Sequence, residues 1–163
     1  MLKLCLTCIG LCFFCSISQA EGTAYKVTYV YDGDTVILIP INSSDPQDAF
    51  KLRLTDIDAP ERNQSYGLKS RRTLIKLCKG KNITVTAQIS GTDQYQRSLG
   101  RIQCNGIDAN YYLVEHGLAW FYKKYSHDLA INEAETNAKK LKLGLWSEEN
   151  PTPPWVWRHE FSQ

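Results

Sequence analysis

Five short runs rich in β-branched and aromatic residues alternate with turn signals along this chain of 163 residues, and they limit the folds it can adopt. The runs cover residues 26–31, 35–41, 50–57, 82–89 and 97–104. The turn after the first run is Asp32-Gly33-Asp34, and the third run stops at Ala59-Pro60. Runs of this length that are bounded by Gly, Pro and Asp predict β-strands.

Helical segments lie between or after these strands rather than in a separate block. They are predicted at residues 66–78, 108–116 and 128–143. Asp108 and Asp128 would open the second and third helices. Residues 146–157, rich in proline and tryptophan, are predicted to follow the surface without forming a helix. Five strands with about three inserted helices predict an α+β fold that is mainly β, a small five-stranded barrel of the OB type.

The N-terminal segment differs in composition from the rest of the chain. Lys3 is the only charged residue before position 21, and an apolar run follows it over residues 4–14. This pattern is typical of a secretory signal peptide, here cleaved after Ala20. A single membrane anchor is the alternative, although a span takes about 20 apolar residues. We expect residues 1–20 to be removed and 21–163 to form one exported domain, in the periplasm or the medium.

The bulk composition fits a soluble globular protein, with 43% hydrophobic and 22% charged residues. Loss of Lys3 with the signal lowers the formal net charge from +2 to +1. A protein this close to neutrality binds nucleic acid through local positive patches and not through a general basic field.

Two cysteines remain after removal of the predicted signal. Cys78 ends a predicted helix and Cys104 ends a predicted strand. An even pair in an exported protein predicts one disulfide bond. Two buried free thiols are the alternative. A zinc site is not expected, because no further Cys or His ligand has suitable spacing.

Three carboxylates are candidates for chemistry. Asp34 follows the glycine-containing turn, and Asp58 lies beside Ala59 at the end of the third strand. Hard cations such as Ca²⁺ take carboxylate and carbonyl oxygens, so Asp34 and Asp58 are predicted ligands. Glu61 can reach the same cleft and take a proton from an attacking water. Each residue alone also fits an ordinary turn, strand end or helix start.

Two arginines would complete such a site. Arg53 and Arg97 each lie in a strand-like segment, where a cation that faces a closed core would be costly. A phosphate suits them, because a guanidinium fork matches two phosphate oxygens and stabilises charge on a five-coordinate phosphorus. Internal salt bridges are the alternative, for example Arg53 with Asp56. Together with the carboxylates, the arginines provide what phosphodiester cleavage requires.

A weaker indication comes from tyrosines and lysines near each other in sequence. Tyr95 stands apart, and Lys123 and Lys124 lie between Tyr122 and Tyr125. Stacking of a base on an aromatic ring contributes ~1–3 kcal/mol and hardly depends on sequence. The same residues also fit buried tyrosines and exposed lysines.

The ordered set of motifs resembles the staphylococcal nuclease family over residues 25–157. The set comprises Asp32-Gly33-Asp34-Thr35, Arg53 through Glu61, Asp93-Gln94-Tyr95-Gln96-Arg97, Gly117-Leu118-Ala119-Trp120 and Gly144-Leu145-Trp146. The resemblance implies an OB-fold barrel that cleaves DNA and RNA with Ca²⁺. By this resemblance, Asp34 and Asp58 would bind Ca²⁺ through their carboxylates, and Ala59 would bind it through its backbone carbonyl. Glu61 would act as the general base, and Arg53 and Arg97 would bind the phosphate.

Departures from the family pattern also lie at the site. Ala59 stands where the best-known member has threonine, and the loop at residues 42–49 is somewhat long. Gln96 replaces the usual glycine before Arg97. A positive φ at this position would strain the turn and could displace the arginine.

Three functional hypotheses remain. The first is an exported Ca²⁺-dependent endonuclease, a hydrolase that cuts DNA and RNA with little sequence preference. We expect it to be a monomer with no stable protein partner and no membrane contact after signal cleavage. The second is a non-catalytic nucleic-acid-binding module on the same barrel. The third is a disulfide-linked exported binding protein, which leaves Arg53 and Arg97 unexplained. The complete set of carboxylates and arginines favours the first.

Overall fold

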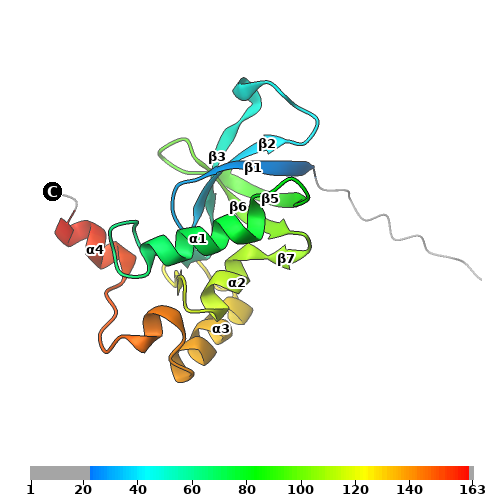
Figure 1. Ribbon diagram of the computed structural model, residues 1–163. Helices are drawn as coiled ribbons and strands as arrows, with labels where there is room; N and C mark the ends of the chain where they lie inside the picture. Colours follow the sequence, from blue (N-terminus) through cyan, green and yellow to red (C-terminus); the bar gives the residue numbers. More distant parts are fainter. Residues whose placement is uncertain (1–22, 162–163) are drawn as a thin grey trace, which may run out of the picture.

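The barrel is the centre of the fold in the computed structural model, which describes residues 23–161. Its strands are β1 (Ala24–Val30), β2 (Thr35–Pro40), β3 (Phe50–Leu54), β5 (Val85–Thr92) and β6 (Ser98–Cys104). Antiparallel pairing joins β3 to β2, β2 to β1, β1 to β5 and β5 to β6. Parallel pairing of β3 with β6 then closes the ring (Figure 1). The predicted five-stranded OB-type barrel is confirmed.

Three two-residue strands extend this framework. They are β4 (Ile57–Asp58), β7 (Ile107–Asp108) and β8 (Trp120–Phe121). The run predicted as one strand over residues 50–57 is divided, because Asp56 adopts a left-handed conformation with φ of 66°. After this break β4 leaves the barrel and pairs with β8, which places Asp58 opposite Trp120. The break therefore redirects the chain just before the candidate carboxylates.

The helices cover one part of the barrel surface (Figure 1). They are α1 (Gly67–Cys78), α2 (Ala109–Glu115), α3 (Leu129–Lys140) and α4 (Pro154–Phe161), with short 3₁₀ turns η1 (Pro46–Asp48) and η2 (Gly144–Ser147). The predicted caps are confirmed: Asp108 accepts from the Tyr111 amide and Asp128 from the Ile131 amide. Helix α3 ends before residue 143 because Lys142 has a φ of 52°.

The prediction that residues 146–157 contain no helix was wrong. Pro154 begins α4, a position where proline is tolerated because the amides of a first helical turn have no intrahelical acceptor. The prolines thus precede or start the helix and do not interrupt it. Figure 1 shows α4 beside the N-terminal end of α1 and apart from α2 and α3.

One hydrophobic core joins the barrel to α1, α2 and α3. Its fully buried side chains include Leu38, Leu52, Leu74, Leu113 and Ile131. The predicted disulfide is present and links the end of α1 to the end of β6, with Cys78 and Cys104 Cα atoms 5.1 Å apart. The predicted signal peptide lies outside the described residues. None of the helices within residues 23–161 has the length and apolar character that a membrane span needs.

Candidate active site

The turn that carries Asp34 packs tightly against α1 and the chain after β4. A Cβ atom added at Gly33 would lie 1.9 Å from the Ser70 hydroxyl oxygen and 2.6 Å from the Ala59 Cβ. No side chain fits in this space, so glycine permits the close approach. The approach brings Asp34 next to the segment that carries Asp58 and Glu61.

Arg53 joins the two predicted metal carboxylates. Its Nε lies 3.2 Å from Asp34 Oδ1, and its Nη2 lies 2.9 Å from Asp58 Oδ1. Its Nη1 also donates to the carbonyls of Leu54 at 2.6 Å and Ile57 at 3.0 Å. The guanidinium is therefore held by backbone acceptors and presented to both carboxylates. The sequence also left internal salt bridges open as an alternative, and Arg53 forms such bridges with Asp34 and Asp58, although within residues 23–161 it forms none with Asp56.

Ala59 contacts Asp34 through its own amide. The Ala59 N–H donates to Asp34 Oδ2 at 2.6 Å, and the Thr35 hydroxyl donates to Asp34 Oδ1 at 2.9 Å. This places Ala59 against the carboxylate, as a ligand set of Asp34, Asp58 and Ala59 requires. The role of the Ala59 carbonyl stays a prediction.

Burial makes the charges of both aspartates unfavourable. Asp34 is 4% exposed and Asp58 is fully buried. Loss of water raises the pKa of Asp34 to about 7, and the charge of Arg53 acts in the opposite direction. Burial likewise raises the pKa of Asp58, against hydrogen bonding from Arg158. An added cation would favour the ionised form of both groups.

Glu61 opens onto a cleft. The cleft has a volume of about 480 Å³ and is lined by Tyr31, Asp32, Glu61, Arg62, Asn63 and Leu68. The Glu61 amide donates to the side-chain oxygen of Gln64 at 3.1 Å, which fixes the start of this loop. Of the three predicted carboxylates, Glu61 is the one that lines this cleft, where a water-activating base has room for a substrate.

Arg158, which the sequence analysis did not single out, occupies the same site. Its Nη2 lies 2.7 Å from Asp58 Oδ2, and its Nη1 lies 3.1 Å from Asp58 Oδ1 and 2.9 Å from Glu61 Oε1. The arginine comes from α4, the helix that the sequence analysis had excluded. An arginine after Trp155 and Trp157 on a helix that starts at Pro154 is the signal that could have found it.

Arg97 is not joined to these carboxylates. Its Nε lies 2.7 Å from Asp93 Oδ2, and its guanidinium lies 5.5 Å from the centre of the Tyr95 ring. In the described part of the chain no hydrogen bond or ion pair links it to Asp34, Asp58 or Glu61. Gln96 has a φ of 61°, so the turn adopts the positive φ that a glycine would favour.

The predicted aromatic surface is divided between two places. Tyr95 is 71% exposed on the turn between β5 and β6. Tyr122 stacks on Trp155 of α4 with ring centres 5.5 Å apart. Burial, and next the charge of Asp58, raises the pKa of Tyr122. Lys123 is exposed.

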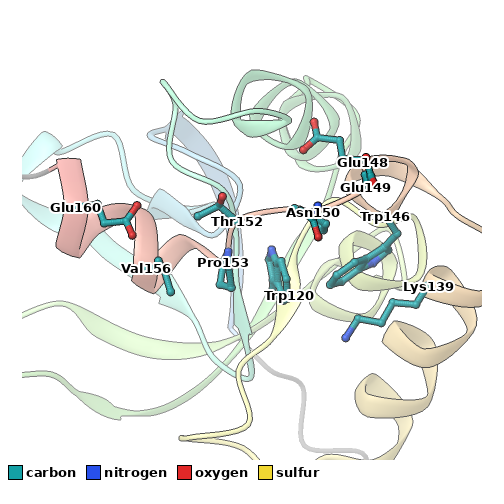
Figure 2. A pocket seen from close by; sticks show the side chains of 11 residues that line it. Trp120, Lys139, Trp146, Glu148, Glu149, Asn150, Thr152, Pro153, Val156 and Glu160 are labelled. Carbon is teal, nitrogen blue, oxygen red and sulfur yellow. The ribbon is translucent and has the colours of Figure 1, made fainter.

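A larger cavity of about 620 Å³ lies on another side of α4 (Figure 2). Trp120 and Trp146 lie side by side there, and the Lys139 amino group lies 4.3 Å from the centre of the Trp146 ring. Val156 and Glu160 of α4 also line it. None of the predicted catalytic residues does, so size alone does not identify the site.

Across residues 23–161, no group of three or more His, Cys, Asp or Glu side chains is arranged to hold a metal ion. The predicted side-chain ligands are thus two carboxylates, Asp34 and Asp58, and their role as a donor set stays a prediction. Ca²⁺ also accepts backbone carbonyls and water, so a set this small fits such an ion.

Comparison with known proteins identifies the family of the chain. A family profile described as staphylococcal nuclease homologue matches residues 51–148. The match includes Arg53, Asp58, Ala59, Glu61 and Arg97, and it ends before Arg158.

Individual relatives extend the match. A protein named uncharacterized endonuclease from Escherichia coli O157:H7 is 38% identical over 82% of this chain and 84% of its own length. A protein of the same name from Haemophilus influenzae is 36% identical over 97% of this chain and 86% of its own length. A micrococcal nuclease from Shigella flexneri is 33% identical over 82% of this chain and 79% of its own length. The chain therefore belongs to the staphylococcal nuclease family.

Proposed function

We propose that this protein is an exported, Ca²⁺-dependent endonuclease that hydrolyses DNA and RNA with little sequence preference. Family membership makes it a nuclease and a hydrolase, with nucleic acid as its substrate. The observation that carries the proposal is the contact of Arg53 with both Asp34 and Asp58, with Glu61 held through Arg158 to the same cluster. This arrangement supports the proposal, because the predicted anion-binding group, cation ligands and base lie in one connected cluster.

The donor set supports a hard cation as the cofactor. Asp34 and Asp58 offer oxygen atoms, and burial raises the pKa of both, so a nearby positive charge would stabilise them. Asp34, Asp58 and the carbonyl of Ala59 would hold Ca²⁺, with water filling the remaining positions. When bound, the ion would polarise the phosphate and favour deprotonation of water.

The side chains of this chain would do the rest of the chemistry. Glu61 takes a proton from the water that attacks phosphorus in line. As the new P–O bond forms, the opposite P–O bond to the sugar breaks, and the leaving oxygen is protonated from solvent. Arg53 donates to phosphate oxygens and stabilises charge that builds in the transition state. Arg97 is proposed as the second phosphate donor, which requires its guanidinium to leave Asp93. Tyr95, Tyr122 and Lys123 are proposed contacts for bases and the backbone.

The proposal of export rests on the signal-like sequence of residues 1–20. The proposal that the protein is a monomer also rests on the sequence. If the proposal holds, the protein recovered from the periplasm or the medium begins at Glu21, which N-terminal sequencing would detect. Gel filtration with light scattering should give the mass of one chain. An N-terminus at Met1 in a membrane fraction would instead favour the anchor.

Nicking of single-stranded and supercoiled DNA tests the activity. The purified, oxidised protein should cut both in Ca²⁺, stop in excess chelator and resume when Ca²⁺ is restored. Glu61→Ala should abolish cleavage, and Arg72→Gln, which changes an exposed arginine of α1, should not. DNA binding without cleavage by folded wild-type protein would replace the enzyme with a binding module and would point to Gln96.

A further inference from the structure

The C-terminal helix α4 contributes a guanidinium to the candidate active site. Arg158 contacts both oxygens of Asp58 and one oxygen of Glu61, at distances between 2.7 and 3.1 Å. Asp58 is fully buried, whereas the Arg158 side chain is 39% exposed. The arginine thus reaches the buried carboxylate from the solvent side, which is the side from which a substrate would arrive.

Other contacts hold α4 in this place. Trp155 stacks on Tyr122, and the Trp157 indole N–H donates to Asn63 Oδ1 at 3.3 Å. The Gln64 side chain donates to the carbonyl of Thr152 at 2.5 Å. Because these contacts do not involve Arg158, the helix can remain docked while the guanidinium changes partners.

The charges of the cluster show what Arg158 changes. The carboxylates of Asp34, Asp58 and Glu61 exceed the guanidiniums of Arg53 and Arg158 by one formal charge. A divalent cation would leave the cluster with one positive charge, which complements the single negative charge of a phosphodiester. Without Arg158 the cation-loaded cluster would be neutral. The second arginine therefore makes the site attractive to a phosphate.

We propose that Arg158 is a phosphate-binding residue of the active site. The Arg158 guanidinium donates to both oxygens of Asp58, so it would have to leave at least one of them if a divalent cation were bound there. Release from Asp58 frees Arg158 Nη2, while Nη1 stays on Glu61. The freed N–H groups then donate to the phosphodiester beside Arg53. This inference rests on the proposed nuclease function.

Three variants separate this role from others. Arg158→Gln removes the charge, Arg158→Lys keeps the charge without the fork, and His159→Gln changes an exposed neighbour on the same helix. At saturating Ca²⁺ we expect Arg158→Gln to lower kcat/KM by about 10²-fold, mainly through kcat, as loss of one transition-state donor does. Arg158→Lys should recover part of the rate, and His159→Gln should match the wild type.

Two binding measurements do not depend on turnover. Calorimetry without nucleic acid should show tighter Ca²⁺ binding by Arg158→Gln, because a competing cation is gone. Fluorescence anisotropy with labelled single-stranded DNA in Ca²⁺ should show about tenfold weaker binding when Arg158→Gln is added to an inactive Glu61→Gln protein. Equal DNA affinity and equal kcat/KM in the presence and absence of Arg158 would overturn the proposal.

The remaining outcomes are also decisive. Faster cleavage by Arg158→Gln at saturating Ca²⁺ would make α4 an inhibitory plug and contradict the proposal. A purely structural role would appear as a changed near-ultraviolet spectrum of Trp155, with full recovery of both spectrum and rate in Arg158→Lys. If the folded wild type does not cut DNA at all, the proposed function fails. The role of Arg158 is then tested by binding alone: equal DNA affinity with and without Arg158→Gln would reject it as a phosphate contact.

Discussion

The candidate active site and the cluster around Arg101 both bring arginine and carboxylates together, but the fold shifts the pKa of Asp34 and that of Asp128 in opposite directions. In the candidate active site, Arg53 and Arg158 contact Asp34, Asp58 and Glu61. In the second cluster, Arg101 lies 2.5 Å from Asp128, 2.6 Å from Asp108 and 3.8 Å from Asp56. The residue types are nearly the same, so composition does not distinguish a catalytic cluster from a structural one.

The Arg101 cluster uses its oxygens for the fold. One oxygen of Asp108 caps α2 and the other accepts from Arg101. Asp128 does the same for α3. The Ile131 amide, together with Arg101, lowers the pKa of Asp128, so the fold stabilises the charged form. This cluster is complete without a further ion.

In the candidate active site, burial disfavours the charged forms of two carboxylates. Burial raises the pKa of Asp34 and Asp58 even with arginines beside them. Carboxylates that the fold disfavours as anions, but that remain close together, are suited to a cation that the protein itself does not supply. The direction of the pKa shift therefore separates Asp34 and Asp58 from Asp128.

The largest expected difference between the clusters is in turnover. Glu61→Gln should lower kcat by about 10²–10⁴-fold, the usual effect of removing a general base. Arg101→Gln should leave kcat of the folded protein within about threefold of the wild type, since Arg101 lies in the structural cluster. Single-turnover cleavage of DNA by folded protein measures both. A collapse of kcat in Arg101→Gln would break the comparison.

Stability should show the reverse order. Arg101→Gln leaves three carboxylates without their cation and should lower the free energy of unfolding by about 2–3 kcal/mol. This is less than the usual cost of breaking a fully buried ion pair, because the Arg101 side chain is partly exposed. Urea unfolding monitored by circular dichroism gives this value. Glu61→Gln should shift it by less than about 0.5 kcal/mol. A larger loss in the Glu61 variant would give that residue a structural role.

Neutralising one aspartate from each cluster should have effects of opposite sign. Asp34→Asn removes a buried charge that opposes folding at neutral pH and should raise Tm. Asp128→Asn keeps a side-chain oxygen for the N-cap but removes the charge that pairs with Arg101, and should lower stability by up to ~1 kcal/mol. Thermal unfolding at pH 7 compares the two directly. A shift of both variants in the same direction would contradict the distinction.

The effects of Asp34→Asn and Asp128→Asn on stability should also depend on pH in opposite ways. Asp34 releases its proton with a pKa near 3.8 when unfolded and about 7 when folded, so its penalty is full above pH 7 and disappears towards pH 4. The gain from Asp34→Asn should shrink over that window. The pKa of Asp128 is lowered by folding, so its contribution is present above about 4 and lost as pH falls through the folded value. Tm against pH for each variant tests both signs.

The smallest effect is expected at the turn that carries Arg97. Gln96 has a φ of 61°, which is strained for a residue with a Cβ. Gln96→Gly should raise the free energy of unfolding by about 0.5–1 kcal/mol. This value is what remains of the relieved strain once the entropic cost of ordering a more flexible glycine is subtracted. Chemical denaturation measures it. An unchanged or lower stability would show that the turn carries no strain.

The barrel could be predicted because the sequence signals for its strands and turns lie close to the elements that they form. Strand runs with turn residues, and caps such as Asp108 and Asp128, lie within a few residues of the structure that they determine. The meeting of Asp34 with Asp58 followed from the family resemblance. The break at Asp56 was missed, because a positive φ there has no glycine to indicate it.

The remaining site residues depend on packing between distant segments. Arg158 reaches Asp58 across a sequence separation of 100 residues, and the position of α4 is set by contacts with Tyr122 and Asn63. Arg97 stays a predicted phosphate contact, and in the structure its Nε pairs with Asp93, four residues away. Sequence also gave no reason to single out Arg101. Pairing between arginines and acids in three dimensions was the part that local patterns could not supply.

Direct binding of Ca²⁺ tests the distinction between the clusters most simply. Isothermal titration without nucleic acid should show one bound ion for the wild type and for Asp128→Asn, and none for Asp58→Asn over the same concentrations. Binding that survives in Asp58→Asn, or that disappears in folded Asp128→Asn, would contradict the assignment of the metal to the Asp34 and Asp58 cluster.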